Sequence, residues 1–155
     1  MQGQDDLDKT NTRVVTAKEM QLIGEITWLL LHSPLHKAYP LSTLEERFIH
    51  ACLLGQCQVF YDQSGPIGLV TWAKVSSKWH ERMLDSDTWP PVHEWDKGDY
   101  LWFMDFVAPF GHCTRIRREL SKQFGNTDKA WCRRIKTNSE RSHICQHHRG
   151  HLFSH

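Results

Sequence analysis

The stretch LWFMDFVAPF, residues 101–110, contains one charged side chain, that of Asp105, in a run that is otherwise almost free of polar atoms. A continuous apolar run of this kind predicts a β-strand that is buried on both faces. An ionised carboxylate in such a strand is costly unless another group pairs with it. The sequence therefore predicts a buried strand at residues 100–108 in which Asp105 has a specific partner.

The candidate partner is His36, in the segment HSPLHKAYP at residues 32–40. A helix is expected before this segment, because TAKE at residues 16–19 is a capping box and apolar residues recur after it at helical spacing. Pro34 disfavours helical geometry at the residue before it, so this helix should end near His32. His36 then lies in a turn bracketed by prolines. A histidine oriented by a buried aspartate suits acid–base or acyl-transfer chemistry, and we predict that this pair is the functional centre.

The rest of the chain predicts an α/β order. A second capping box, STLE at residues 42–45, is expected to open a second helix that ends near Gly55. The later segments are two strands that form a hairpin (57–62 and 67–75), a short helix (78–84), an irregular loop (85–99) and the buried strand (100–108). An amphipathic helix that ends near residues 125–126 and two more strands (129–135 and 142–147) follow. This order predicts a single-domain α/β sandwich, with helices packed on a mixed sheet of about five strands. We expect the domain to cover residues 16–155 and to follow a flexible tail, residues 1–15.

The composition sets the broad class of protein. With 155 residues and 39% hydrophobic residues, the chain can form one domain with a core. No stretch approaches about 18 uninterrupted apolar residues, and the amino terminus is acidic rather than signal-like. The five cysteines are an odd number without a C-x-x-C pair, which favours free thiols in a reducing compartment. The sequence therefore predicts a cytoplasmic protein without a membrane partner, and none of its cysteines resembles a nucleophile.

Charge is distributed unevenly along the chain. The overall formal charge is +1, but residues 1–112 carry a net charge of −6 and residues 113–155 a net charge of +7. Such a basic region can bind nucleic acid, an anionic membrane or an acidic protein, or it can be a solvated helix face. A non-enzymatic module that binds an acidic partner or nucleic acid through this basic third is therefore the alternative to an enzyme.

The last residues are rich in metal-binding side chains. Imidazole and thiolate groups are suitable ligands for transition metals, and residues 143–151 contain His143, Cys145, His147, His148 and His151. Their spacing matches no standard zinc pattern, so we expect no metal site.

Two motifs resemble those of a known family. The segments GEITWL (24–29) and HSPLHK (32–37) resemble the amino-terminal signature of the RTX toxin-activating lysine acyltransferases. The segment WFMDFVAPFG (102–111) resembles their second signature, and VTWA (70–73) resembles the strand between the two. The motifs occur in the family's order and separation, and the resemblance covers roughly residues 20–136.

This resemblance implies a GNAT-like fold and a concrete activity. Members of the family transfer a fatty acyl group from acyl carrier protein to internal lysines of an RTX protoxin, in the cytoplasm before secretion. Their essential histidine falls on His36 and their essential aspartate on Asp105, while a serine with a supporting role falls on Ser33. The resemblance also implies a homodimer and no bound cofactor, with acyl carrier protein and the protoxin as partners in place of nucleic acid or a membrane.

The sequence also gives information on the acyl donor and on the possible roles of His36. The chain lacks the Q/R-x-x-G-x-G/A loop by which GNAT enzymes hold coenzyme A, which argues against a third interpretation, an ordinary acetyl-CoA enzyme. Acyl carrier protein is strongly acidic, so the candidates for docking it are Arg115, Arg117, Arg118 and Lys122. His36 could deprotonate the target lysine, with Asp105 stabilising the imidazolium, or its imidazole could attack the thioester. Both routes stay open at this stage.

Overall fold

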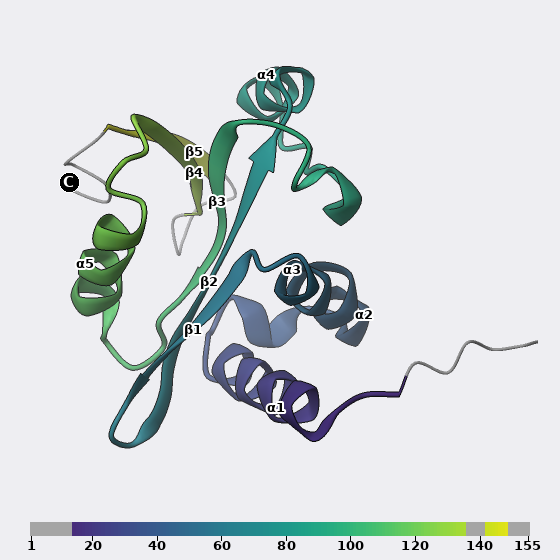
Figure 1. Ribbon diagram of the computed structural model, residues 1–155, viewed down its shortest axis with the longest axis vertical. Coiled ribbons are helices and arrows are strands. Elements are labelled where there is room, and N and C mark those ends of the chain that lie inside the picture. Colours follow the sequence, from purple (N-terminus) through teal and green to yellow (C-terminus); the bar gives the residue numbers. More distant parts are fainter. Residues whose placement is uncertain (1–13, 136–141, 149–155) are drawn as a thin grey trace, which may run out of the picture.

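The computed structural model describes residues 14–135 and 142–148. Five strands form one mixed sheet in the order β1-β2-β3-β4-β5 (Figure 1). Strands β3 and β4 run parallel, and the other neighbours are antiparallel. The strands are β1 (Cys57–Asp62), β2 (Gly65–Val75), β3 (Tyr100–Val107), β4 (Lys129–Ile135) and β5 (Ser142–His148). The expected GNAT-like α/β sandwich with a mixed sheet is confirmed, whereas most of the expected tail, residues 1–13, lies outside the described residues.

Helices cover both faces of the sheet. α1 (Ala17–Leu31), α2 (Leu41–Thr43) and α3 (His50–Leu53) lie on one face, and α5 (Cys113–Gln123) lies on the other (Figure 1). Ile116 and Leu120 of α5 are fully buried against the sheet. The shorter elements are η1 (His36–Ala38), the π-helix η2 (Leu44–Ile49), α4 (Ser77–Asp85) and η3 (Val92–Glu94). None of the helices within the described ranges is long and apolar enough to cross a bilayer.

The first helix begins and ends as its sequence predicts. Thr16 caps α1: its hydroxyl accepts a hydrogen bond from the Glu19 amide at 3.2 Å, and the Glu19 carboxylate accepts one from the Thr16 amide at 2.9 Å. The helix ends at Leu31, with His32 as its C-cap, three residues before Leu35 and the turn that contains His36. The capping box and Pro34 therefore set the two ends of α1, and with them the position of His36.

The expectation that Ser42 opens the second helix is wrong. The helix begins at Leu41, and Pro40, its N-cap, makes no side-chain capping bond. The Pro40 carbonyl accepts a hydrogen bond from the Thr43 amide at 3.0 Å, so Ser42 already lies inside the first turn and cannot cap it. The helix then widens into η2, which was not predicted. π-Helical turns are often found at functional sites.

A β-bulge in β3 determines which way Asp105 points. Residue pairing with β2 runs Thr71 to Asp105 and then Trp72 to Phe103, so Met104 is an extra residue without a partner. Before the bulge, Phe103 packs on the α5 side and Met104 on the side of α3. Without the extra residue, Asp105 would follow Phe103 into the α5 core, because side chains alternate along a strand. The bulge instead turns Asp105 toward the face covered by α1 and η2.

The sheet opens at the same place. The parallel pairing of β3 with β4 covers only residues 101–103 and 130–132. Beyond Phe103 the two strands separate, and residues 103–106 of β3 and 132–134 of β4 line a common cavity. At the carboxyl end of β3, the Asp105 carboxylate is therefore turned by the bulge, and the sheet is open beside it.

Candidate active site

Asp105 is a buried carboxylate that three groups contact. Its side chain is 3% exposed, and Arg47 Nη2 donates a hydrogen bond to Oδ1 at 2.7 Å. The hydroxyl of Thr71, on the adjacent strand β2, donates to Oδ2 at 2.9 Å. Burial alone would raise the pKa of Asp105, but the imidazole of His36, the guanidinium of Arg47 and the Thr71 hydroxyl together hold it below its usual value. Asp105 is therefore ionised at neutral pH.

His36 lies across from this carboxylate. Its Nε2 is 3.7 Å from Asp105 Oδ1, which is too long for a direct hydrogen bond and short enough for an ion pair when the ring is protonated. On the other side of the ring, Nδ1 is 2.7 Å from the hydroxyl of Ser33. The imidazole side chain is 6% exposed and packs edge-on against Tyr39 and Phe48. The structure thus brings Ser33, His36 and Asp105 together, as the sequence predicts, and their catalytic roles remain predictions.

Arg47 is the group that sequence reasoning missed. It lies on η2, and its guanidinium stacks on Trp89 at 4.5 Å from the ring centroid, besides its bond to Asp105. In the sequence it follows two glutamates, a pattern typical of a solvated helix face. The hydrogen bond that Thr71 donates to Asp105 was not predicted either, although Thr71 belongs to the VTWA motif. Only the fold shows that both side chains point at the carboxylate.

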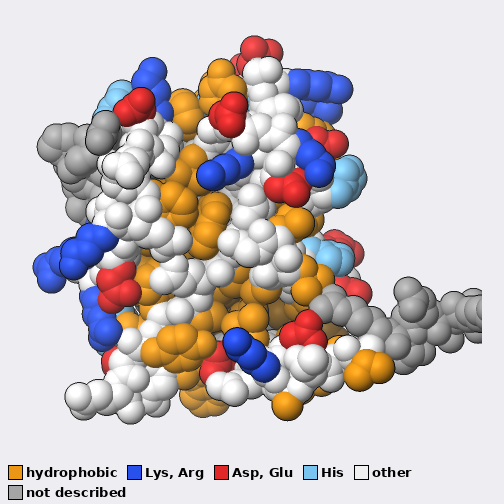
Figure 2. Space-filling model, in the orientation of Figure 1, with side chains coloured by type: hydrophobic (Ala, Val, Ile, Leu, Met, Phe, Trp, Pro, Cys, Tyr) orange, Lys and Arg blue, Asp and Glu red, His pale blue; other side chains and the backbone are white. Residues whose placement is uncertain are grey.

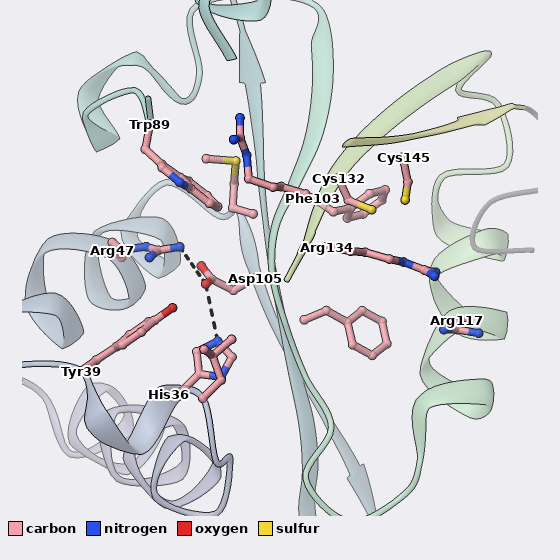
Figure 3. Close-up of a pocket in the computed structure, with 14 residues that line it drawn as sticks. His36, Tyr39, Arg47, Trp89, Phe103, Asp105, Arg117, Cys132, Arg134 and Cys145 are labelled. Atoms are coloured by element: carbon pink, nitrogen blue, oxygen red, sulfur yellow. Dashed lines mark hydrogen bonds and ion pairs between the residues drawn. The ribbon is translucent and has the colours of Figure 1, made fainter. Parts of the chain in front are cut away.

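Asp105, His36 and Arg47 line a cavity of about 670 Å³. In Figure 3, His36, Tyr39, Arg47 and Trp89 approach from one side of β3. The opposite side is formed by residues of β4, β5 and α5: Cys132, Arg134, Cys145 and Arg117. Asp105 lies between the two sides. Figure 2 shows hydrophobic side chains gathered in the hollowed middle of the molecule. A reactant in this cavity could contact His36 and Asp105 at one side and arginines at the other.

The expected carrier-docking residues differ in their surroundings. Arg115 pairs with Glu119 at 3.2 Å and donates to the Tyr61 carbonyl at 2.9 Å. Arg117 is half-buried and lines the cavity, whereas Arg118 and Lys122 are exposed on α5. Three further basic residues of the carboxy-terminal third (Lys136, Arg141 and Arg149) lie outside the described residues. Arg115, Arg118 and Lys122 are thus the exposed members of the predicted set, and Arg115 is held by Glu119 and the Tyr61 carbonyl.

The five cysteines are all free, as the sequence predicts. Cys132 and Cys145 face each other across β4 and β5, and Cys132 Sγ lies 3.3 Å from His147 Nε2. Burial, with help from the neighbouring Cys145, raises the pKa of Cys132 to about 11, so it is a thiol at neutral pH. Within residues 14–135 and 142–148, no three side chains are grouped as metal ligands. The His143 side chain and His151 lie outside the described part.

The fold and the site together define a class: a GNAT-like α/β protein whose sheet opens beside an imidazole–carboxylate pair. The chain belongs to the RTX toxin acyltransferase family, whose model matches residues 15–148. Over a matched segment of 104 residues, which is 67% of this chain, it is 31% identical to the leukotoxin-activating lysine-acyltransferase of Aggregatibacter actinomycetemcomitans.

Other relatives give the same picture. The RTX-I toxin-activating lysine-acyltransferase of Actinobacillus pleuropneumoniae is 30% identical over 106 residues, 68% of this chain. A protein-lysine myristoyltransferase of Escherichia coli is 28% identical over 107 residues, 69% of this chain. In all three cases the matched segment spans 62% of the relative's length.

Proposed function

We propose that this protein is a cytoplasmic lysine acyltransferase that moves a fatty acyl group from acyl carrier protein to internal lysines of an RTX protoxin. The observation that carries the proposal is the His36–Asp105 pair in an open cavity of a chain that belongs to this family. The names of the relatives support lysine as the acceptor and, in one case, a myristoyl group as the cargo. A homodimer is part of the proposal, and light scattering on the purified protein would test it.

The geometry suits proton transfer from the acceptor. A lysine ammonium must lose a proton before its nitrogen can attack a thioester. In the tautomer that we propose, Nδ1–H of His36 donates to the Ser33 hydroxyl, and the lone pair of Nε2 faces Asp105. An ammonium between Nε2 and the carboxylate would be attracted by Asp105 and would give its proton to His36.

The chemical step then balances without a cofactor. The freed amine attacks the thioester carbonyl, the carbon–sulfur bond breaks, and the carrier thiolate takes the proton held by the His36 imidazolium. The nitrogen that attacked gives its remaining extra proton to the imidazole, which releases it to water. The products are an amide on the protoxin, the thiol form of the carrier and one proton in solution. Asp105 stabilises the imidazolium each time it forms.

The nucleophilic route uses the same nitrogen. If Nε2 attacks the thioester first, an acyl group is attached to the enzyme before the protoxin binds. Intact-mass spectrometry of the enzyme mixed with acylated carrier alone separates the routes. A mass increase by one acyl group that is absent in His36→Ala indicates the nucleophilic route, and an unchanged mass indicates the general-base route.

Acylation of a protoxin tests the proposed function as a whole. The purified protein is incubated with acylated carrier and a protoxin of the RTX class, and modified lysines are mapped by mass spectrometry. Amide-linked acyl groups on internal lysines are expected with the enzyme and not without it. Unmodified lysines after prolonged incubation with active carrier would contradict the proposal.

The exposed cations of α5 are predicted to help dock the acidic carrier. Substituting Arg118→Glu together with Lys122→Glu should raise KM for the carrier about tenfold at low salt with little change in kcat, because charge steering acts on encounter. The rise should shrink at higher ionic strength, where such charges are screened. Lys18→Glu with Lys78→Glu, two exposed cations on α1 and α4, is the matched control. Equal KM values for the two double variants would exclude this surface.

A further inference from the structure

A second cavity, of about 810 Å³, lies beside the catalytic one. The end of α3 and the loop between α4 and β3 form its apolar lining, which consists of Leu53, Leu54, Pro90, Pro91, Val92 and Trp95. Leu53 is 48% exposed and Leu54 is 39% exposed, although both are large apolar side chains. The proposed mechanism makes no use of this space.

The two cavities meet at one pair of side chains. Arg47 and Trp89 line both of them, and the guanidinium stacks on the indole ring. The same guanidinium donates to Asp105. The two cavities are therefore adjacent at this pair, and a ligand that passes it would extend from the His36–Asp105 site into the second cavity.

The wall of the second cavity is held in place by hydrogen bonds. Trp95 is 1% exposed, and its Nε1 donates to the Pro90 carbonyl at 3.0 Å. Its carbonyl accepts bonds from the Lys74 amide at 2.6 Å and from Gln56 Nε2 at 2.8 Å. Gly98 follows in close contact with β2, where an added Cβ would lie 2.1 Å from the Val75 carbonyl oxygen. The loop is therefore a preformed wall, as expected of a binding site.

The combined space has two chemically different ends. Arg117 and Arg134 line the catalytic cavity on the β4 and α5 side, across β3 from Trp89. Arg133 also lines this cavity, but its guanidinium donates to Asp87 and to the Met83 and Ser86 carbonyls. An acyl group on a carrier protein has a matching polarity, with an anionic phosphodiester arm on one side of the thioester and an alkyl chain on the other. Arginines suit the phosphodiester, and the apolar cavity suits the chain.

We infer that the second cavity holds the alkyl chain of the acyl donor, with the thioester carbonyl beside His36 and Asp105 and the Arg47–Trp89 pair at the entrance. This inference rests on the proposed function and assigns a site to its substrate. A peptide segment around the target lysine fits the cavity less well, because buried peptide groups need hydrogen-bond partners. The polar lining residues other than Arg47 (Glu46, His50 and His93) are all exposed.

A variant that fills the cavity tests the inference through chain length. Leu53→Trp should lower kcat/KM for tetradecanoyl transfer at least about tenfold relative to hexanoyl transfer, because the filled cavity leaves the additional methylenes of the longer chain in water. Leu84→Trp, at an exposed apolar position of α4 that lines neither cavity, is the matched control and should leave the ratio unchanged. An unchanged ratio in folded Leu53→Trp overturns the inference and leaves the proposed function intact. Wild-type protein that transfers neither chain overturns both.

Cross-linking provides a second measurement that needs no variant. A carrier loaded with a tetradecanoyl chain that ends in a diazirine is irradiated with the wild-type protein, and the labelled peptides are sequenced. Labels at Leu53, Leu54 or residues 90–95 are expected. Labels confined to α5 or β4 would place the chain at the arginine side and overturn the inference.

Discussion

Replacing His36 with alanine is expected to lower the rate of lysine acylation by about 10²- to 10⁴-fold, the usual contribution of a positioned general acid–base group. The imidazole is the titratable group that faces Asp105 across 3.7 Å, and alanine leaves the target ammonium without a proton acceptor. The measurement is kcat/KM for acyl transfer to the protoxin, followed by mass spectrometry. If His36 is instead the nucleophile, the same loss is expected, and the acyl-enzyme mass described above distinguishes the cause.

His32→Ala is a suitable control for this experiment. His32 belongs to the same motif and is exposed, and its Nδ1 lies 2.8 Å from the Trp28 carbonyl rather than at the carboxylate. It should retain activity within a few-fold of the wild type. A His36→Ala protein that keeps its circular dichroism spectrum and more than a tenth of the wild-type rate would remove His36 from the mechanism.

The elements of the fold follow from local signals in the sequence. The capping box at Thr16 and the proline at position 34 set the bounds of α1, and the apolar run at 101–107 marks the buried strand β3. These signals act over a few residues, so one sequence is enough to detect them. The second helix shows their limit, because the capping sequence at Ser42 was overridden by a turn that begins at Pro40.

The site depends on features with no local signal. Periodicity places Asp105 on the α5 face of β3, and only the bulge at Met104 turns it toward His36. Arg47 is 58 residues away in sequence and contacts Asp105 because η2 packs over the sheet at that point. The apolar run around Asp105, the proline-bracketed turn at His36 and the family resemblance all pointed to the two residues of the pair. The residues that surround the pair could be identified only from the three-dimensional arrangement.

Asp105→Asn is expected to reduce both activity and stability. Asparagine keeps the shape of the side chain but removes the charge that pairs with Arg47 and would stabilise the His36 imidazolium. The rate of acylation should fall by about 10²-fold or more. Because the two groups act as one unit, His36→Ala combined with Asp105→Asn should be no slower than His36→Ala alone. A multiplicative loss in the double variant would contradict a shared role.

The same substitution gives a pH signature in stability. The pKa of Asp105 is lowered in the folded protein, so its ionised form contributes stability that is fully present above the unfolded-state pKa of about 3.9. That contribution is lost as the pH falls from there through the folded-state pKa. At pH 7 the variant should be less stable by about 1–3 kcal/mol, since it leaves a partly exposed guanidinium without its carboxylate.

Urea unfolding of wild type and Asp105→Asn between pH 7 and pH 3 checks this signature. The difference in unfolding free energy should not shrink between pH 7 and pH 5, where protonated His36 would still pair with the carboxylate of the wild type. It should shrink below about pH 4, because the wild-type carboxylate is then protonated and loses its charge, as the asparagine side chain already has. Asp99→Asn removes an exposed carboxylate and should change the stability little at any of these pH values. A difference that persists unchanged at pH 3, or a variant more stable than wild type at pH 7, would show that Asp105 is not held ionised by its neighbours.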